Sequence, residues 1–167
     1  GSDVLDIYSF QVDCGPDFDV DRVEEEITKK LALAKVTASV SAGELPVVLT
    51  PMAFMMTVGP ALGVGFNGKM VEQGASPLAG KIDEKLFDER LSIADDATLY
   101  RSPQSCPFDD EGVPTRRVPL VEEGVVMNFL FDLQTAGKVG ANSTGNGYGA
   151  TASPRGSATV VRGGEGT

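Results

Sequence analysis

The stretch of residues 109–133 constrains the fold most, because it alternates turn signals with two apolar runs. Residues 109–114 combine three acidic side chains with a glycine and a proline, which favours a tight polar turn. Residues 118–121 are typical of a strand, residues 122–124 of a hairpin turn, and residues 125–133 of the next strand. The stretch therefore predicts an antiparallel, β-rich domain.

Two segments carry helix patterns. Residues 20–35 repeat apolar side chains at helical spacing after Asp19, a natural N-cap, with glutamates early and lysines late. A second helix is expected over residues 51–58, where Thr50 caps and Pro51 occupies the first helical position. The second segment is apolar on most sides, so we expect it to be buried.

The rest of the chain is typical of short strands and glycine-rich loops. Together with the two principal helices, it predicts an α+β fold with a mostly antiparallel sheet. Further strands are expected at 3–12, 36–40, 45–49, 91–93 and 157–162, a helical turn at 135–139, and loops at 69–80 and 140–156.

Composition excludes several functions. The 167 residues contain no histidine, so a histidine-dependent triad, an imidazole base and a HExxH-type zinc site cannot be built from this sequence. A formal charge of -10 argues against direct contact with nucleic acid or an anionic membrane. Two cysteines and no long apolar run or signal sequence favour a cytoplasmic location.

Two motifs resemble ligand-binding sites, but a structural role explains each of them better. Gly63-Val64-Gly65-Phe66-Asn67-Gly68 matches G-x-G-x-x-G, but a helix precedes it where a dinucleotide site needs a strand, so we interpret it as a backbone bend. The acidic run 109–111, with Asp95 and Asp96, matches no calcium loop. We expect a solvated or turn-stabilising patch with Arg116 and Arg117 as charge partners.

The sequences PFDDEGVPTRR (107–117), EEGVVMNFLFD (122–132) and STGNG (143–147) resemble the TldD/PmbA family of zinc peptidases, also described as modulators of DNA gyrase. The resemblance runs from about Pro46 to about Val161. It implies an incomplete C-terminal domain over 45–167, truncated at its end, preceded over 1–44 by the end of an N-terminal or linking region (strand, helix, strand).

The resemblance also implies site residues. In catalytic TldD-type members the second helix carries two zinc-binding histidines and a general-base glutamate. The match places Met55 and Met56 at the first histidine and the glutamate, and Pro60 at the second histidine. None of the three suits zinc chemistry, so the resemblance is to the PmbA-type branch. Gly145, Asn146 and Gly147 would bind substrate near its passage; an ordinary surface loop is the alternative.

The function that follows is the PmbA-like subunit of a heteromeric metallopeptidase that acts in proteolysis or maturation of peptides. This chain would hold no cofactor, and zinc would belong to a TldD-like catalytic partner, with a homo-oligomer as the other possible assembly. Whether the chain counts as an enzyme stays open, because it would be a non-catalytic partner. The alternative is a regulatory or binding module of the gyrase-modulator type with no peptidase role.

Overall fold

A computed structural model of the chain describes residues 7–9, 12, 14–16, 18–36 and 38–163. They fall into two compact units, Gly1–Val48 and Leu49–Thr167. The first contains helix α1 (Val20–Ala34), which confirms the helix predicted there. Asp19 caps it by accepting a hydrogen bond from the Arg22 backbone N–H at 3.0 Å. No side chain of α1 is buried.

The strands predicted beside α1 are not observed. The described residues of 36–40 and 45–49 form no strand, and their side chains are exposed. Apolar alternation in these stretches meets no neighbouring strand to pair with. The strand expected at 3–12 falls mainly outside the described residues, and the described ones, 7–9 and 12, are not in a strand.

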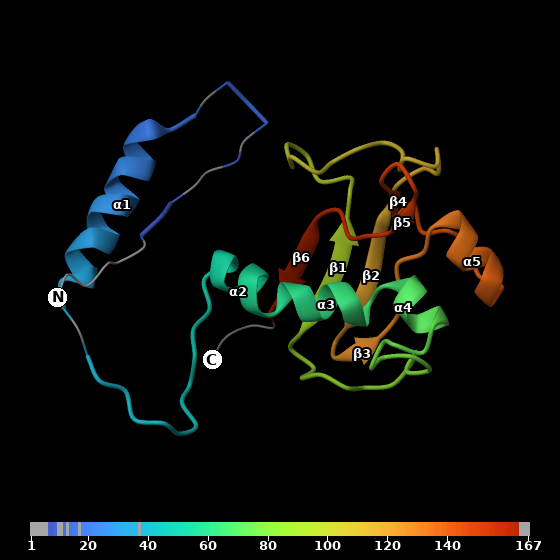
Figure 1. Ribbon diagram of the computed structural model, residues 1–167, viewed down its shortest axis with the longest axis horizontal. Helices are drawn as coiled ribbons and strands as arrows, with labels where there is room; N and C mark the ends of the chain where they lie inside the picture. The colour runs from blue at the N-terminus through green and yellow to red at the C-terminus, as the bar shows by residue number, and fades with distance from the viewer. Residues whose placement is uncertain (1–6, 10–11, 13, 17, 37, 164–167) are drawn as a thin grey trace. The chain divides into compact units, whose positions relative to one another are not determined.

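The second unit places helices against an antiparallel sheet in the order β3-β2-β1-β6, with a separate β4–β5 pair (Figure 1). This arrangement confirms the predicted α+β class and its mostly antiparallel sheet. The helices are α2 (Pro51–Thr57), α3 (Gly59–Gly65), α4 (Gly68–Glu72) and α5 (Leu133–Val139). The strands are β1 (Ser92–Asp96), β2 (Arg117–Glu122), β3 (Val125–Val126), β4 (Gly147–Tyr148), β5 (Ser153–Pro154) and β6 (Thr159–Arg162).

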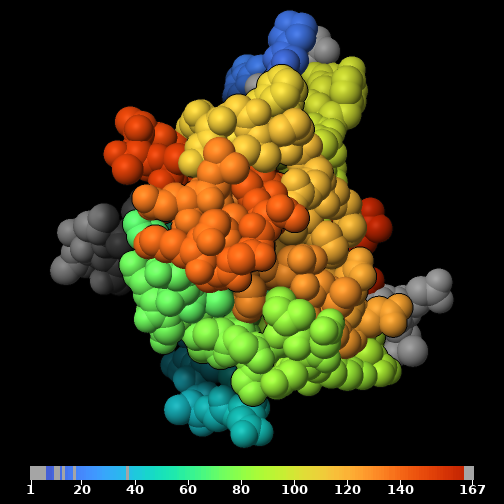
Figure 2. Space-filling model, turned by 90° about the vertical axis from the view of Figure 1, so that its right-hand side faces the viewer, coloured from blue at the N-terminus to red at the C-terminus, as the bar shows by residue number. Residues whose placement is uncertain are grey.

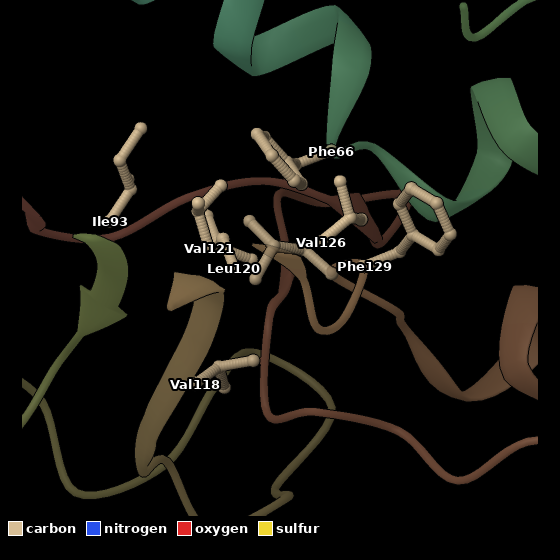
Figure 3. Packing of buried hydrophobic residues seen from close by; sticks show 8 residues of the cluster. Phe66, Ile93, Val118, Leu120, Val121, Val126 and Phe129 are labelled. Carbon is tan, nitrogen blue, oxygen red and sulfur yellow. The ribbon is translucent and has the colours of Figure 1, made fainter. Parts of the chain in front are cut away.

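A β-bulge shapes the core. In the pairing of β1 with β2, Ile93 lies opposite Val121 while Ala94 lies opposite Pro119, so Leu120 is an extra residue in β2. As a result, both Leu120 and Val121 are buried. Figure 3 shows Phe66, at the end of α3, directed toward these side chains. The core cluster is Phe66, Ile93, Val118, Leu120, Val121, Val126, Phe129 and Leu130.

The strand predicted at 125–133 is shorter than expected. β3 ends at Val126, and Asp132 accepts a hydrogen bond from the Thr135 N–H as the cap of α5. Between them the chain turns toward α4, where the Leu130 carbonyl accepts a hydrogen bond from the Gly68 N–H at 2.8 Å. The contact requires glycine, since a Cβ at residue 68 would overlap the Phe131 ring.

The expectation of a buried second helix is wrong. α2 has no buried residue, and Met55 and Met56 are 50% and 63% exposed. The apolar composition of this segment could not show how little of the helix other elements cover. The helix also continues beyond Val58 as α3, and part of the loop expected at 69–80 is helix α4. The hairpin turn at 122–124, the β1 strand and the helix after Asp132 lie where the sequence indicated them.

Candidate functional site

A cavity of about 450 Å³ lies between the α2–α3 helices and the sheet. Met55, Gly59 and Gly63, spaced four residues apart on the helices, form one wall. The segment that leads into β6 lines it as well, through Arg155, Gly156, Ser157 and Thr159. The other lining residues are Leu62, Phe66, Ile93, Asp95, Gln104, Leu120 and Leu130. The cavity therefore combines an apolar interior with a few polar groups.

Asp95 anchors the cavity wall. Its side chain is 1% exposed. Oδ1 accepts the Ser157 backbone N–H at 2.7 Å, and Oδ2 accepts the Ser157 hydroxyl at 2.8 Å and the Asn146 amide at 2.7 Å. Since a buried carboxylate is costly unless it is hydrogen-bonded, these three donors hold the strand end and segment 155–157 together.

Asn146 is the second element of this network. Its side chain is 1% exposed. Beyond its bond to Asp95, its amide donates to the Arg155 carbonyl at 3.2 Å, and its own backbone carbonyl accepts the Arg155 N–H at 2.9 Å. The Asn146 side-chain oxygen Oδ1 is buried and has no hydrogen-bond partner among the described residues.

Arg155 lies exposed at the rim of the cavity. Its guanidinium carbon stands 5.3 Å from the centroid of the Tyr148 ring, a cation–π arrangement. The Tyr148 hydroxyl lies 3.4 Å from the Cys106 thiol. Burial, followed by the hydrogen bond with Cys106, raises the pKa of Tyr148 above its ordinary value.

The acidic run 109–111 stabilises its own turn, as one of the two expectations had it: Asp109 Oδ1 accepts the Glu111 N–H at 3.0 Å and the Val113 N–H at 2.8 Å, while Asp110 is exposed. Asp109 is buried, and its Oδ2 accepts the Gly147 N–H at 2.9 Å. Asp110 accepts the Gly149 N–H at 2.7 Å, and Glu111 accepts the Leu133 N–H at 2.7 Å. Figure 2 shows the corresponding segments in contact, the acidic turn in yellow and the later segment in orange.

The basic pair was expected to neutralise this acidic run, but Arg116 donates to the Ser143 carbonyl at 2.9 Å. The three carboxylates are occupied by backbone N–H groups instead, as the bonds above show. The acidic turn therefore stabilises the glycine-rich loop at residues 147–149 through hydrogen bonds. Charge patterning could not reveal this, because the donors lie 22 to 39 residues away in the sequence.

The site residues expected from the sequence are only partly brought together. Met55 lines the cavity, whereas Met56 and Pro60 are exposed and do not line it. Gly145, Asn146 and Gly147 are buried and do not line the cavity. Asn146 is linked to it indirectly, because its side-chain amide donates a hydrogen bond to the lining residue Asp95. Substrate binding by these three residues stays a prediction.

Sequence reasoning missed Asp95 and Arg155 as site residues. The one local signal was that Asp95 directly follows an apolar run. Burying a carboxylate there is costly unless hydrogen-bond partners lie nearby.

The side chains of the helix do not suit Zn²⁺, since the Met55 thioether is a poor zinc ligand and Pro60 offers no side-chain donor. No group of three or more metal-ligating side chains occurs in the described part of the chain.

None of the helices among the described residues is long and apolar enough to cross a bilayer.

The fold and cavity define an α+β domain in which a two-part helix covers a short antiparallel sheet. Residues 42–167 match the family model described as the PmbA/TldA metallopeptidase C-terminal domain. An Archaeoglobus fulgidus protein named metalloprotease is 37% identical over 72% of this chain and 28% of its own length. A Saccharolobus solfataricus protein named zinc metalloprotease TldD homolog is 28% identical over 77% of the chain and 29% of its own length.

Solved structures agree. A Thermotoga maritima protein, described as a modulator of a DNA gyrase, superposes with a TM-score of 0.80 at 29% identity, covering 89% of this chain and 34% of that one. TldE from Thermococcus kodakarensis gives 0.58 at 34% identity, covering 67% and 25%. The chain belongs to the TldD/PmbA family. It spans about a quarter to a third of the length of these relatives.

Proposed function

We propose that this chain is part of a PmbA-like subunit of a heteromeric TldD/PmbA metallopeptidase that acts in proteolysis or maturation of peptides, and that it does not hold the zinc itself. One observation carries the proposal: Met55 lines the cavity at the position that the resemblance gives to the first zinc histidine. With no histidine in the sequence, zinc and the general base would come from a TldD-like subunit in the cytoplasm.

The division of labour follows from the side chains present. Met55 cannot supply a good zinc ligand, and Met56 cannot take a proton, so this helix contributes shape rather than chemistry. The names of relatives, metalloprotease and zinc metalloprotease TldD homolog, support the peptidase half of the proposal. The absence of histidine from the sequence supports the PmbA-like half.

The test compares this chain alone, a histidine-bearing TldD-type protein alone, and a mixture of the two. Zinc is measured by elemental analysis, and cleavage is followed with a quenched fluorescent peptide. We expect no stoichiometric zinc and no cleavage from the chain alone, and faster cleavage in the mixture than from the TldD-type protein alone. Stoichiometric zinc together with peptide cleavage by the chain alone would overturn the proposal.

A variant checks the assignment of the helix. The triple change Met55→His, Met56→Glu and Pro60→His restores the ligand pattern at the positions that the resemblance gives. If those positions are correct, the variant gains zinc relative to the unchanged chain. The matched control places the same three residues at Thr28, Lys29 and Leu33, exposed positions that repeat the spacing on α1, and is expected to gain none. Equal zinc in both variants would refute the assignment.

The alternative is a regulatory module of the gyrase-modulator type, which rests on the similarity to the Thermotoga maritima protein described in that way. Partner capture with this chain as bait separates the two functions. Recovery of a histidine-bearing relative supports the peptidase subunit, and recovery of a topoisomerase without such a relative supports the regulatory module. A bait that returns only further copies of this chain would favour a homo-oligomer.

A further inference from the structure

We propose that the cavity between α2–α3 and β1 binds the carboxyl-terminal end of a peptide, with an apolar last side chain inside and its carboxylate on Arg155. The inference deepens the proposed function, because it rests on peptides being the ligands, and it specifies which part of the peptide is bound. It concerns binding by this chain alone and requires neither zinc nor a partner.

The interior of the cavity suits an apolar side chain. Its volume of about 450 Å³ lies within the range of roughly 300–1,000 Å³ typical of ligand pockets. Ile93, Leu120 and Leu130 line it together with the bare helix at Gly63. Among the described residues outside the helix itself, no atom lies within 4 Å of the place where a Cβ of residue 63 would stand. The helix wall therefore leaves room for a guest side chain.

The accessible charge of the cavity is positive. Asp95 is 1% exposed, and its carboxylate is engaged by three protein donors, so it is turned toward the protein. Arg155 is exposed and is the only lysine or arginine among the described residues that line the cavity. In a chain with a formal charge of -10, a single cation beside an apolar cavity is complementary to a carboxylate on an apolar group.

Arg155 is also held in place before any ligand arrives. Its backbone N–H and carbonyl are both bonded to Asn146, and its guanidinium lies over the Tyr148 ring. A planar guanidinium can donate two parallel hydrogen bonds to one carboxylate. The fixed backbone and the stacking on the Tyr148 ring reduce the freedom that Arg155 loses when a ligand binds, and with it the entropic cost of binding.

The polar side chains of the cavity favour a peptide over a fatty acid. Gln104 and Thr159 are exposed and line it beside the apolar residues. The backbone amides of a peptide can hydrogen-bond to such groups, whereas an alkyl chain would displace their water and offer no hydrogen bond in return. The peptide end is therefore the occupant that uses both the charge and the polar groups.

The experiment measures binding of two pentapeptides that end in leucine, each fluorescently labelled at its N-terminus. One has a free carboxylate and the other a C-terminal amide. Fluorescence anisotropy with the full chain is expected to show binding of the amide about tenfold weaker, as for loss of a charge-assisted contact. Arg155→Gln should remove the difference, and Gly63→Leu, which fills the cavity, should weaken binding of the free acid.

Arg162→Gln is the matched control, because Arg162 lies on β6 and lines a different cavity. It is expected to keep the preference for the free acid, and far-UV circular dichroism verifies that each variant is folded. Equal affinity for acid and amide, no binding of either, or an unchanged preference in Arg155→Gln would each overturn the proposal. So would decanoate, if it displaced the peptide as effectively as an unlabelled free-acid peptide does.

The result can be separated from the test of the proposed function. If this chain accelerates peptide cleavage by the TldD-type protein but shows no preference for the free-acid peptide, this inference alone fails. If the free-acid peptide binds through Arg155 but this chain does not accelerate cleavage by the TldD-type protein, the peptide site stands and the proposed role in a heteromeric peptidase fails.

Discussion

Asp95 illustrates how one side chain can organise a cavity while being almost fully buried. Its two oxygens accept hydrogen bonds from Ser157 and Asn146, which lie 62 and 51 residues further along the chain. The same Asn146 fixes both backbone groups of Arg155. The position of the cation at the rim therefore depends on a carboxylate that is 1% exposed to solvent.

Replacing Asp95 by leucine should destabilise the chain strongly. Asp95→Leu leaves the Ser157 N–H, the Ser157 hydroxyl and the Asn146 amide without their acceptor, and we expect a loss on the order of 3 kcal/mol in the free energy of unfolding. Urea unfolding followed by circular dichroism measures it. Glu122→Leu, at an exposed strand end, is the control and should change stability by less than about 0.5 kcal/mol.

A loss for Asp95→Leu no larger than for Glu122→Leu would mean that the hydrogen bonds of Asp95 contribute little to stability.

At the scale of elements, two glycines of the G-x-G-x-x-G segment differ in whether the structure requires glycine at their position. Gly68 allows α4 to approach the Phe131 ring and the Leu130 carbonyl, whereas a Cβ at Gly63 would meet no described atom within 4 Å outside its own helix. Gly68→Ala should therefore destabilise by about 1–3 kcal/mol through overlap. Gly63→Ala should stabilise by about 0.5–1 kcal/mol, because alanine favours the helix.

Thermal unfolding of the two glycine variants side by side provides the measurement, and the signs of the two shifts decide. Stabilisation by Gly68→Ala would show that the chain relaxes around the added methyl group. Destabilisation by Gly63→Ala would indicate that the cavity wall does not tolerate a Cβ there.

Local signals predicted the elements that depend on local physics. Asp19 and Thr50 marked helix starts, and Glu122-Glu123-Gly124 marked a hairpin turn, because caps and turns are decided within a few residues. The strands expected at 36–40 and 45–49 failed, since a strand needs a partner that the pattern cannot supply.

The site was predictable only in part for a related reason. The resemblance identified Met55, which does line the cavity. Asp95 and Arg155 become site residues only when β1, the glycine-rich loop and segment 155–157 come together in space. Contacts across 51 and 62 residues leave no periodic trace in a sequence.

For the whole molecule, the two units differ in what stabilises them. The second unit has its own buried core around Val121 and Val126, whereas α1 has no buried side chain. A 15-residue helix without packing is marginal in water. Amides of α1 should therefore exchange with solvent quickly, and those of β1 should exchange near the rate of global unfolding.

Hydrogen exchange followed by mass spectrometry of peptides from α1 and from β1 tests this difference. Protection of α1 equal to that of β1 would show that tertiary packing stabilises it. If α1 is already protected in this way, adding a TldD-type protein should not increase the protection of its amides further.

The three consecutive acids at 109–111 each accept a hydrogen bond from a different distant backbone N–H group, Asp109 from Gly147, Asp110 from Gly149 and Glu111 from Leu133. Their order thus carries structural information that their net charge does not. Two chains with the same acidic content here but a different order would be alike in solubility and unlike in loop geometry. Protein engineers who alter acidic surface runs to tune solubility should leave this tripeptide unchanged.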